Sequence, residues 1–580
     1  MNRPLFLLLG SLLSLQLSAC QVPGLTGDLG QLPDQSGITP GPKGPKPTDG
    51  IITLPNLSLP PALAPEAAMA DQARAGNAQM TGAMPGQTDM LNQPFATEEP
   101  QPTATPSPAP TSSSAQEPPP EPVPPVQMRD FFYFSYDDSA STAGVEQTLY
   151  ALENNLPPNP AWVRPWEFLN YERIGAGQAA QLRQAGPFSV SAGLWQHALP
   201  ASDATAYDLG IYVGAPDISR DERRPLVLTL VLDVSGSMNN ASGVNNSNAS
   251  LLDLARMGLQ ALPAQLKAGD TINLVSFSNQ AKVRLQNWTY QGDPAEYLAV
   301  VNALETEGGT DLNAGLKQAY ALAREAYQPD AINRVLMLTD AYANQGQIDA
   351  TEIARNTRME DREGIYFSGL GFGAGFNEAF LNTLTEAGQG TYASVITEAD
   401  ARRSFGERFM ALVNIAARDV RFRLDYPAAL THVGSAAEQR SQTAAEVQPV
   451  HFSYNTSQFF LERFTHASEG DLLAGNLTLT ISYTDPVTGA AREETLDFDL
   501  DAVRNQNLAG IKDARLVLLL TQLIRGQVSP EQARSEMEAL LATHSSPLAA
   551  RYKGYLETWL RLSGGDTPVV NTDQSPGSDS

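Results

Sequence analysis

The chain has 580 residues, too many for a single hydrophobic core, so several domains are expected. Its formal net charge of −26 at pH 7 argues against nucleic acid or anionic lipid as a general partner. The single cysteine, Cys20, lies near the start of the sequence, which excludes disulfides and thiolate metal sites from the remainder.

Residues 1–20 have the pattern of a secretory signal peptide. Arg3 precedes an apolar run that is too short to span a bilayer, and the segment ends in the small residues Leu17-Ser18-Ala19-Cys20. These four residues resemble the bacterial lipobox, in which the cysteine becomes an acylated amino terminus. The resemblance implies a lipid anchor at Cys20, with palmitate among its acyl chains. Gln21 then implies the outer membrane or cell surface rather than the inner membrane.

Two segments are too polar to fold. Residues 21–127 are rich in Pro, Gly, Ser, Thr and Gln, a composition that predicts a disordered tether. Residues 563–580 are predicted to form a disordered tail for the same reason. The foldable material therefore lies between 128 and 562.

The foldable part begins with an aromatic-rich and β-rich flanking region, residues 128–220, and continues with residues 221–417, where strand-like runs alternate with amphipathic helices. The predicted strands are Leu226–Leu232, Thr271–Phe277, Arg334–Thr339 and Ile365–Leu370. The predicted helices are Leu251–Leu266, Leu312–Tyr327 and Ile348–Glu363. This alternation predicts an α/β fold with a doubly wound, mostly parallel sheet.

Residues 418–510 return to β character, and residues 511–562 are predicted to form a small helical region. The segment 477–483 alternates strictly between apolar and polar residues, as does a strand with one solvated face. Segment 186–220 alone has too few strands to bury a face, so we expect it to pair with strands in 418–500. The α/β unit is then inserted in, or flanked by, a β-sandwich-like domain.

Oxygen-bearing side chains follow the predicted strands of the α/β unit. Asp233, Ser235 and Ser237 follow one buried strand, Asp340 follows another, and Thr310 precedes a helix. Ligand sites of open α/β sheets lie at the carboxyl ends of the strands. A donor set made only of oxygen suits a hard divalent cation better than zinc or copper.

The three loops together resemble the metal-ion-dependent adhesion site (MIDAS) of the von Willebrand factor type A (VWA) domain. The matching runs are Asp-Val-Ser-Gly-Ser at 233–237, Gly-Gly-Thr-Asp at 308–311 and Leu-Thr-Asp at 338–340. The resemblance implies Mg²⁺, with Mn²⁺ or Ca²⁺ as alternatives. It implies that Ser235 and Ser237 bind the metal directly, that Thr310 does so when a partner is engaged, and that Asp233 and Asp340 bind mostly through water.

Further likeness extends over roughly residues 128–525. The segments 134–142, 158–171 and 371–373 resemble bacterial exported VWA proteins called YfbK-like. One departure is Ala341, where many VWA domains have glycine, and this change is expected to restrict movement of the loop. The Asn- and Ser-rich stretch 239–250 is expected to be a solvated loop, with a partner-facing rim as the alternative.

The function expected from these features is binding of a protein partner, which offers an acidic side chain to the metal, by a lipid-anchored cell-envelope protein. A metal-assisted hydrolase and a structural envelope assembly factor are the alternatives. The motif loops supply no general base or nucleophile beyond Thr310 and Asp311, the five histidines are scattered, and no Walker lysine motif occurs. The sequence therefore favours a protein that is not an enzyme and has no catalytic residues.

Overall fold

The computed structural model describes residues 129–176, 182–198, 205–242, 249–344, 346, 364–387, 390–466 and 475–564. All of them belong to one compact unit, residues 118–580. The predicted signal peptide with Cys20, the whole of the tether, the predicted helix 348–363 and all but the first two residues of the predicted tail lie outside the described residues.

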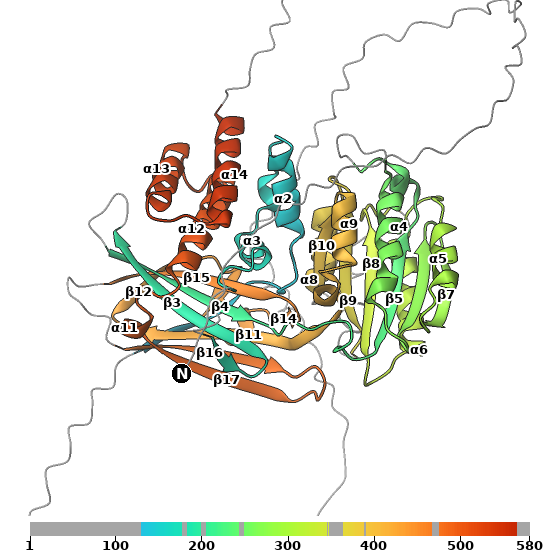
Figure 1. The fold of residues 1–580 in the computed structure, drawn as a ribbon, viewed down its shortest axis with the longest axis horizontal. Helices are drawn as coiled ribbons and strands as arrows, with labels where there is room; N and C mark the ends of the chain where they lie inside the picture. The colour runs from blue at the N-terminus through green and yellow to red at the C-terminus, as the bar shows by residue number, and fades with distance from the viewer. Residues whose placement is uncertain are drawn as a thin grey trace, which may run out of the picture. The chain divides into compact units, whose positions relative to one another are not determined.

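The α/β unit is built on a six-stranded sheet with the order β10-β9-β8-β5-β6-β7 (Figure 1). Its strands are β5 (Leu226–Asp233), β6 (Thr271–Phe277), β7 (Ala281–Thr289), β8 (Ile332–Thr339), β9 (Tyr366–Phe372) and β10 (Thr391–Val395). All neighbours pair in parallel except β7, which is antiparallel to β6 at one edge. Every residue of β5, β6, β8 and β9 is buried, which explains their nearly continuous apolar sequences.

Helices cover both faces of this sheet, so the predicted doubly wound fold is confirmed. They are α4 (Leu251–Ala261), α5 (Ala295–Asn302), α6 (Leu312–Glu325), α8 (Glu378–Ala387), α9 (Glu398–Ser404) and α10 (Phe409–Val413). Leu230 of β5 packs in one apolar core with α4, α5 and α10, whereas its neighbour Val231 packs in the opposite core with α6 and α8. The alternation of side chains along a strand produces these two cores. The predicted helix 251–266 ends as an α-helix at Ala261, because Pro263 follows and turns the chain into a 3-10 helix.

Two antiparallel sheets form the flanking sandwich. One has the order β13-β1-β11-β16-β17 with β14 on β11, and the other has the order β12-β15-β4-β3-β2. The strands are β1 (Arg129–Ser135), β2 (Arg183–Ala185), β3 (Phe188–Ala198), β4 (Thr205–Gly214), β11 (Ile415–Pro427), β12 (Leu430–Ser435), β13 (Gln439–Ser441), β14 (Val450–Ser453), β15 (Ser457–His466), β16 (Asn476–Thr484) and β17 (Ala491–Asp499). Side chains of both sheets share one apolar core.

The strands before and after the α/β unit pair with each other. β4 is antiparallel to β15, and β1 is antiparallel to β11. The predicted pairing between 186–220 and 418–500 is therefore present, and the α/β unit is inserted between β4 and β11.

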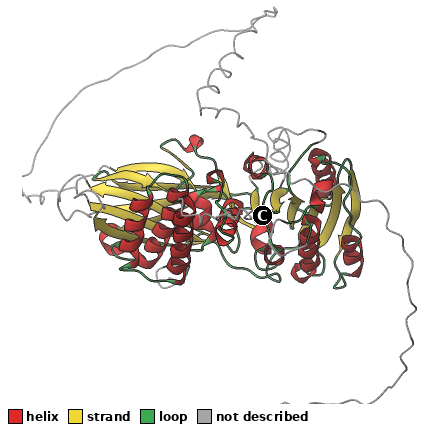
Figure 2. Ribbon diagram, turned by 90° about the horizontal axis from the view of Figure 1, so that it is seen from above, coloured by secondary structure: helices red, strands yellow, loops and turns green. Residues whose placement is uncertain are grey.

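Among the described residues, six further α-helices belong to the sandwich part of the chain, and several gather over one of its sheets (Figures 1 and 2). They are α2 (Ala143–Glu153), α3 (Pro165–Tyr171), α11 (Leu500–Val503), α12 (Leu508–Ile524), α13 (Pro530–Leu541) and α14 (Pro547–Ser563). Ser529 and Ser546 cap α13 and α14. The apolar α12 packs against β3, β4 and β15. Among the described residues, no helix is both long and apolar enough to cross a membrane.

Two glycines allow α12 to lie close to this sheet. Gly193 and Gly210 face each other across β3 and β4. A Cβ at Gly193 would overlap the carbonyl oxygen of Gln506, and one at Gly210 would lie 2.6 Å from Ile511 Cγ1. The missing side chains thus make room for the chain that enters α12.

Gly193→Ala is expected to lower the free energy of unfolding by about 2 kcal/mol, because the new methyl group must displace backbone. Chemical denaturation followed by circular dichroism measures this change. Gly554→Ala is the matched control, because Gly554 lies in α14 with no atom near its absent Cβ. It should raise stability by about 0.5–1 kcal/mol. Equal effects of the two variants would contradict the assigned role of Gly193.

Candidate functional site

The predicted metal-binding residues lie on three loops at one edge of the α/β sheet. Asp233 is the last residue of β5, and Ser235 and Ser237 lie in the 3-10 turn that follows. Asp340 directly follows β8, which is parallel to β5 and paired with it. The carboxyl ends of parallel neighbours meet at the same edge, so the two acids are brought together by the fold.

Backbone hydrogen bonds hold the loops against one another. The Gly236 N–H donates to the Gly308 carbonyl at 3.0 Å, and the Glu307 N–H donates to the Val234 carbonyl at 2.6 Å. These bonds place the loop that carries Thr310 beside the loop that carries the two serines. Backbone contacts therefore hold these loops together without a bound ligand.

Four of the five predicted residues interact with one another. Asp233 Oδ1 accepts from the Ser235 N–H at 2.9 Å, and the hydroxyls of Ser235 and Ser237 are 3.0 Å apart. The Ser237 side chain interacts with the Asp340 carboxyl group and lowers its pKa, against the effect of burial. Asp233, Ser235 and Asp340 are buried, and Ser237 is half-buried.

Thr310, the fifth residue, is buried on the neighbouring loop. Its N–H donates to Asn344 Oδ1 at 2.9 Å, and Asn344 Nδ2 donates to its hydroxyl at 3.4 Å. Thr339 is a second supporting residue, since its hydroxyl donates to Asp233 Oδ2 at 2.7 Å. Neither Asn344 nor Thr339 was predicted as a site residue from the sequence. Thr339 could have been found as the residue before Asp340, whereas nothing in the sequence around Asn344 identifies it.

The two carboxyl groups carry the electrostatic character of the site. Burial raises the pKa of Asp233 to about 6, and the nearby charge of Asp340 adds to this effect, while hydrogen bonds from Thr339 and Ser235 oppose it. Burial also raises the pKa of Asp340. Among the described residues, no Lys or Arg pairs with either acid. A bound cation would offset this desolvated negative charge, so the residues fit a divalent metal.

The donor set contains two carboxylates and three hydroxyls. Within the described ranges, no group of three or more His, Cys, Asp or Glu residues is placed to hold a metal. A cation here would thus depend on hydroxyl and water oxygens, which suits Mg²⁺ better than zinc or copper. Asp311, considered above as a stand-in for a catalytic group, caps α6 by accepting from the Ala314 N–H at 2.9 Å.

Ala341 has the left-handed backbone conformation, with φ 61°, which explains why glycine would suit this position. An L-residue pays about 1–2 kcal/mol for this conformation. Two contacts accompany the strain: the Ala341 N–H donates to Thr339 Oγ1 at 2.9 Å, and the residue is fully buried in the apolar core. The expected restriction of loop movement stays a prediction.

Two segments border the site, one with an exposed aromatic side chain and one that is only partly described. Tyr342 is 49% exposed directly beside Asp340. The middle of the predicted loop 239–250, residues 243–248, is not described. Its two ends are joined by a bridge between Ala241 and Ser250. The partner-facing role of this loop stays a prediction.

Residues 228–343 match the sequence profile of the von Willebrand factor type A domain. The matched segment contains all five predicted metal-binding residues.

Three curated relatives are each 26% identical to the chain over the segment that matches. The Escherichia coli (strain K12) protein "Uncharacterized protein YfbK" matches over 332 residues, 56% of this chain and 55% of that protein. "Uncharacterized protein sll0103" of Synechocystis sp. matches over 37% of this chain and 49% of that protein. The chain thus spans about half the length of these curated relatives. "Inter-alpha-trypsin inhibitor heavy chain H1" of Bos taurus matches over 34% of this chain and 22% of that protein.

A solved structure with likeness to the chain is "von Willebrand factor type A from Catenulispora acidiphila". It is 15% identical, covers 66% of this chain and 91% of its own, and has a TM-score of 0.38.

Proposed function

Because residues 228–343 form a von Willebrand factor type A domain, we propose that the chain binds a protein partner through a Mg²⁺-dependent adhesion site. The observation that supports this proposal is the pair of buried acids, Asp233 and Asp340, beside two serine hydroxyls, with no Lys or Arg paired with either acid in the described part of the chain. Proteins with this domain commonly bind other proteins.

Ser235, Ser237 and Thr310 would hold the metal, with Asp233 and Asp340 acting through water. When bound, Mg²⁺ supplies a positive charge, and a carboxylate from another protein can complete the coordination of the metal. The protein's part is to hold the hydroxyls in place, through the loop contacts of Gly236 and Glu307, and to keep the carboxylates desolvated. An acidic side chain of a partner is therefore the ligand that the site fits. Mn²⁺ and Ca²⁺ share the preference for oxygen ligands and are the alternatives.

We also propose where in the cell the protein lies. The lipobox-like run that ends in Cys20, followed by Gln21, supports lipid anchoring in the cell envelope, at the outer membrane or cell surface. The polar tether 21–127 would then hold the folded part away from the lipid. Labelling of cells with a clickable palmitate analogue tests the anchor, since wild-type protein should take up label and Cys20→Ala should not.

Partner capture tests the adhesion site. Wild-type protein, Ser235→Ala and the exposed control Ser535→Ala are used as bait on detergent-solubilised envelope, in Mg²⁺ and in EDTA. We expect a partner that wild type and Ser535→Ala retain in Mg²⁺ and lose in EDTA, and that Ser235→Ala does not retain in either condition. A partner held equally by all three proteins in EDTA would contradict the proposal and favour a structural assembly role.

A further inference from the structure

A cavity that none of the five predicted metal-binding residues lines lies between the α/β unit and the helices of the sandwich. Its volume is about 680 Å³, within the range of small-molecule sites. Residues of α2, α3, α9, α10 and α14 line it, together with Asn455 and Thr456. Its walls carry four arginines, five carboxylates and three tyrosines.

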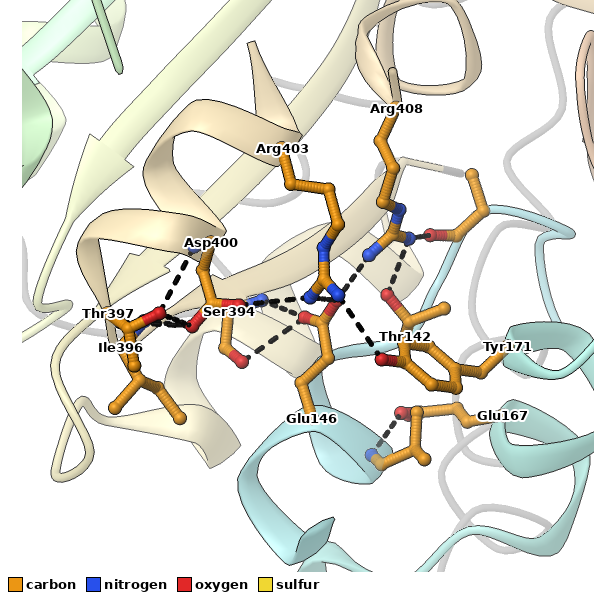
Figure 3. Close-up of polar contacts among 12 residues, drawn as sticks. Thr142, Glu146, Glu167, Tyr171, Ser394, Ile396, Thr397, Asp400, Arg403 and Arg408 are labelled. Atoms are coloured by element: carbon orange, nitrogen blue, oxygen red, sulfur yellow. Dashed lines mark hydrogen bonds and ion pairs between the residues drawn. The ribbon is translucent and has the colours of Figure 1, made fainter. Parts of the chain in front are cut away.

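The arginines of the cavity are already paired. Figure 3 shows Glu146 of α2 between Arg403 and Arg408, and Glu146 lies 3.6 Å from the Arg403 guanidinium. Arg173 pairs with Asp217, and Arg551 pairs with Glu172. The guanidinium groups that could bind an anion are therefore already occupied by carboxylates.

Three acceptor groups of the lining have no cationic partner in the part of the chain that the structure describes. Glu153 and Glu407 line the cavity and have no cationic partner among the described residues. Glu153 accepts one hydrogen bond, from the Tyr555 hydroxyl at 2.7 Å. Asn170 is only 4% exposed; its Nδ2 donates to the Tyr136 carbonyl, while its Oδ1 has no partner in the described structure. A buried acceptor without a donor is costly, so it indicates a ligand or water that donates.

Aromatic rings lie on the same walls. Tyr150, Tyr171 and Tyr555 line the cavity, and the Arg403 guanidinium already lies 6.0 Å from the ring centre of Tyr171. Tyr150 and Glu153 are one helical turn apart on α2, so a tyrosine ring and a carboxylate that accepts from the Tyr555 hydroxyl lie on one helix face. Aromatic faces attract organic cations.

We propose that this cavity binds a small organic cation that carries primary ammonium groups. Its ammonium groups would donate to Glu153, Glu407 and Asn170, and its methylene chain would pack on the tyrosine rings. An anionic ligand would need to break existing arginine pairs, and a neutral ligand would gain no charge interaction from Glu153 and Glu407, which are exposed to solvent.

Spermidine is the probe, measured by isothermal titration calorimetry with the full chain in EDTA and 150 mM NaCl. Saturable binding at one site is expected, with little heat from glutarate or glycerol. Glu153→Gln and Glu407→Gln should each weaken affinity about threefold, and the double variant about tenfold. Tyr150→Leu should weaken it about threefold. Glu493→Gln in β17 removes the same charge outside the cavity and should leave affinity unchanged.

Equal affinity of wild type and the double variant, or an equal loss in Glu493→Gln, would overturn the proposal, because spermidine would then bind only to the general negative charge. Binding of glutarate as tight as that of spermidine would overturn it as well. Ser235→Ala separates this site from the adhesion site, since it should lose Mg²⁺ and keep spermidine.

Discussion

Asp233→Asn is expected to abolish Mg²⁺ binding and, at the same time, to stabilise the metal-free protein at neutral pH. The variant loses the charge that a cation needs, so Mg²⁺ affinity should fall by at least a hundredfold. The fold should survive, because an amide can still accept from the Ser235 N–H and donate to the hydroxyl of Thr339.

The gain in stability follows from the raised pKa of Asp233. Since its folded pKa of about 6 is above the ordinary 3.8, the stability linked to its protonation is present below 3.8 and lost as pH rises through 6. At pH 7.5 the ionised, buried carboxylate thus lowers the free energy of unfolding by about 3 kcal/mol. The neutral amide of asparagine does not have this effect. The gain should be smaller at pH 5, where wild-type Asp233 already holds a proton.

Urea unfolding in EDTA at pH 5 and pH 7.5 measures the gain, and calorimetry at pH 7.5 measures Mg²⁺ affinity. Asp311→Asn is the control. Asn also caps helices well, and Asp311 already serves α6, so its stability and Mg²⁺ affinity should stay close to wild type. A wild-type Mg²⁺ affinity in Asp233→Asn would refute the metal site, and a loss of stability at pH 7.5 would refute the desolvation argument.

Glu146→Ala is expected to destabilise the protein by about 3 kcal/mol, because Arg408 loses the carboxylate with which it is paired. Glu146 is buried and accepts from the Ser394 N–H at 2.7 Å and from the Ser394 hydroxyl at 3.2 Å (Figure 3). It therefore joins α2 of the sandwich part to β10 of the α/β unit. Glu146→Gln keeps an acceptor and should lose only about 1–2 kcal/mol.

Urea unfolding gives these free energies, and hydrogen exchange reports whether the amide of Ser394 loses protection. Glu538→Ala on the exposed face of α13 is the control and should change stability by less than about 0.5 kcal/mol. Equal stability of Glu146→Ala and Glu538→Ala would show that the Glu146 contacts contribute nothing.

The sequence predicts the elements whose pattern is set by burial on two faces. Strands β5, β6, β8 and β9 read as apolar runs because both sides of the sheet are covered, and they were found within one to two residues. Strands β7 and β10 were missed. β7 is a largely solvated edge strand with Lys282 and Arg284, and β10 has only five residues, so neither carries a clear apolar pattern.

The predicted site residues were brought to one edge because parallel strands end together, which a sequence can indicate. The supporting groups could not be found in this way. Asn344 reaches Thr310 from 34 residues away, and Glu146 reaches Ser394 from 248 residues away. Such contacts depend on how separate elements pack, and no local spacing records them.

The α/β unit enters from β4 and leaves into β11, and these two strands lie in different sheets of the sandwich. A pull on a partner held at the metal edge would reach the sandwich along two covalent connections at once. Mechanical load would be divided between both sheets, and a unit tied at two points cannot swing about a single linker. The insertion is thus suited to a protein that binds its partner under mechanical tension.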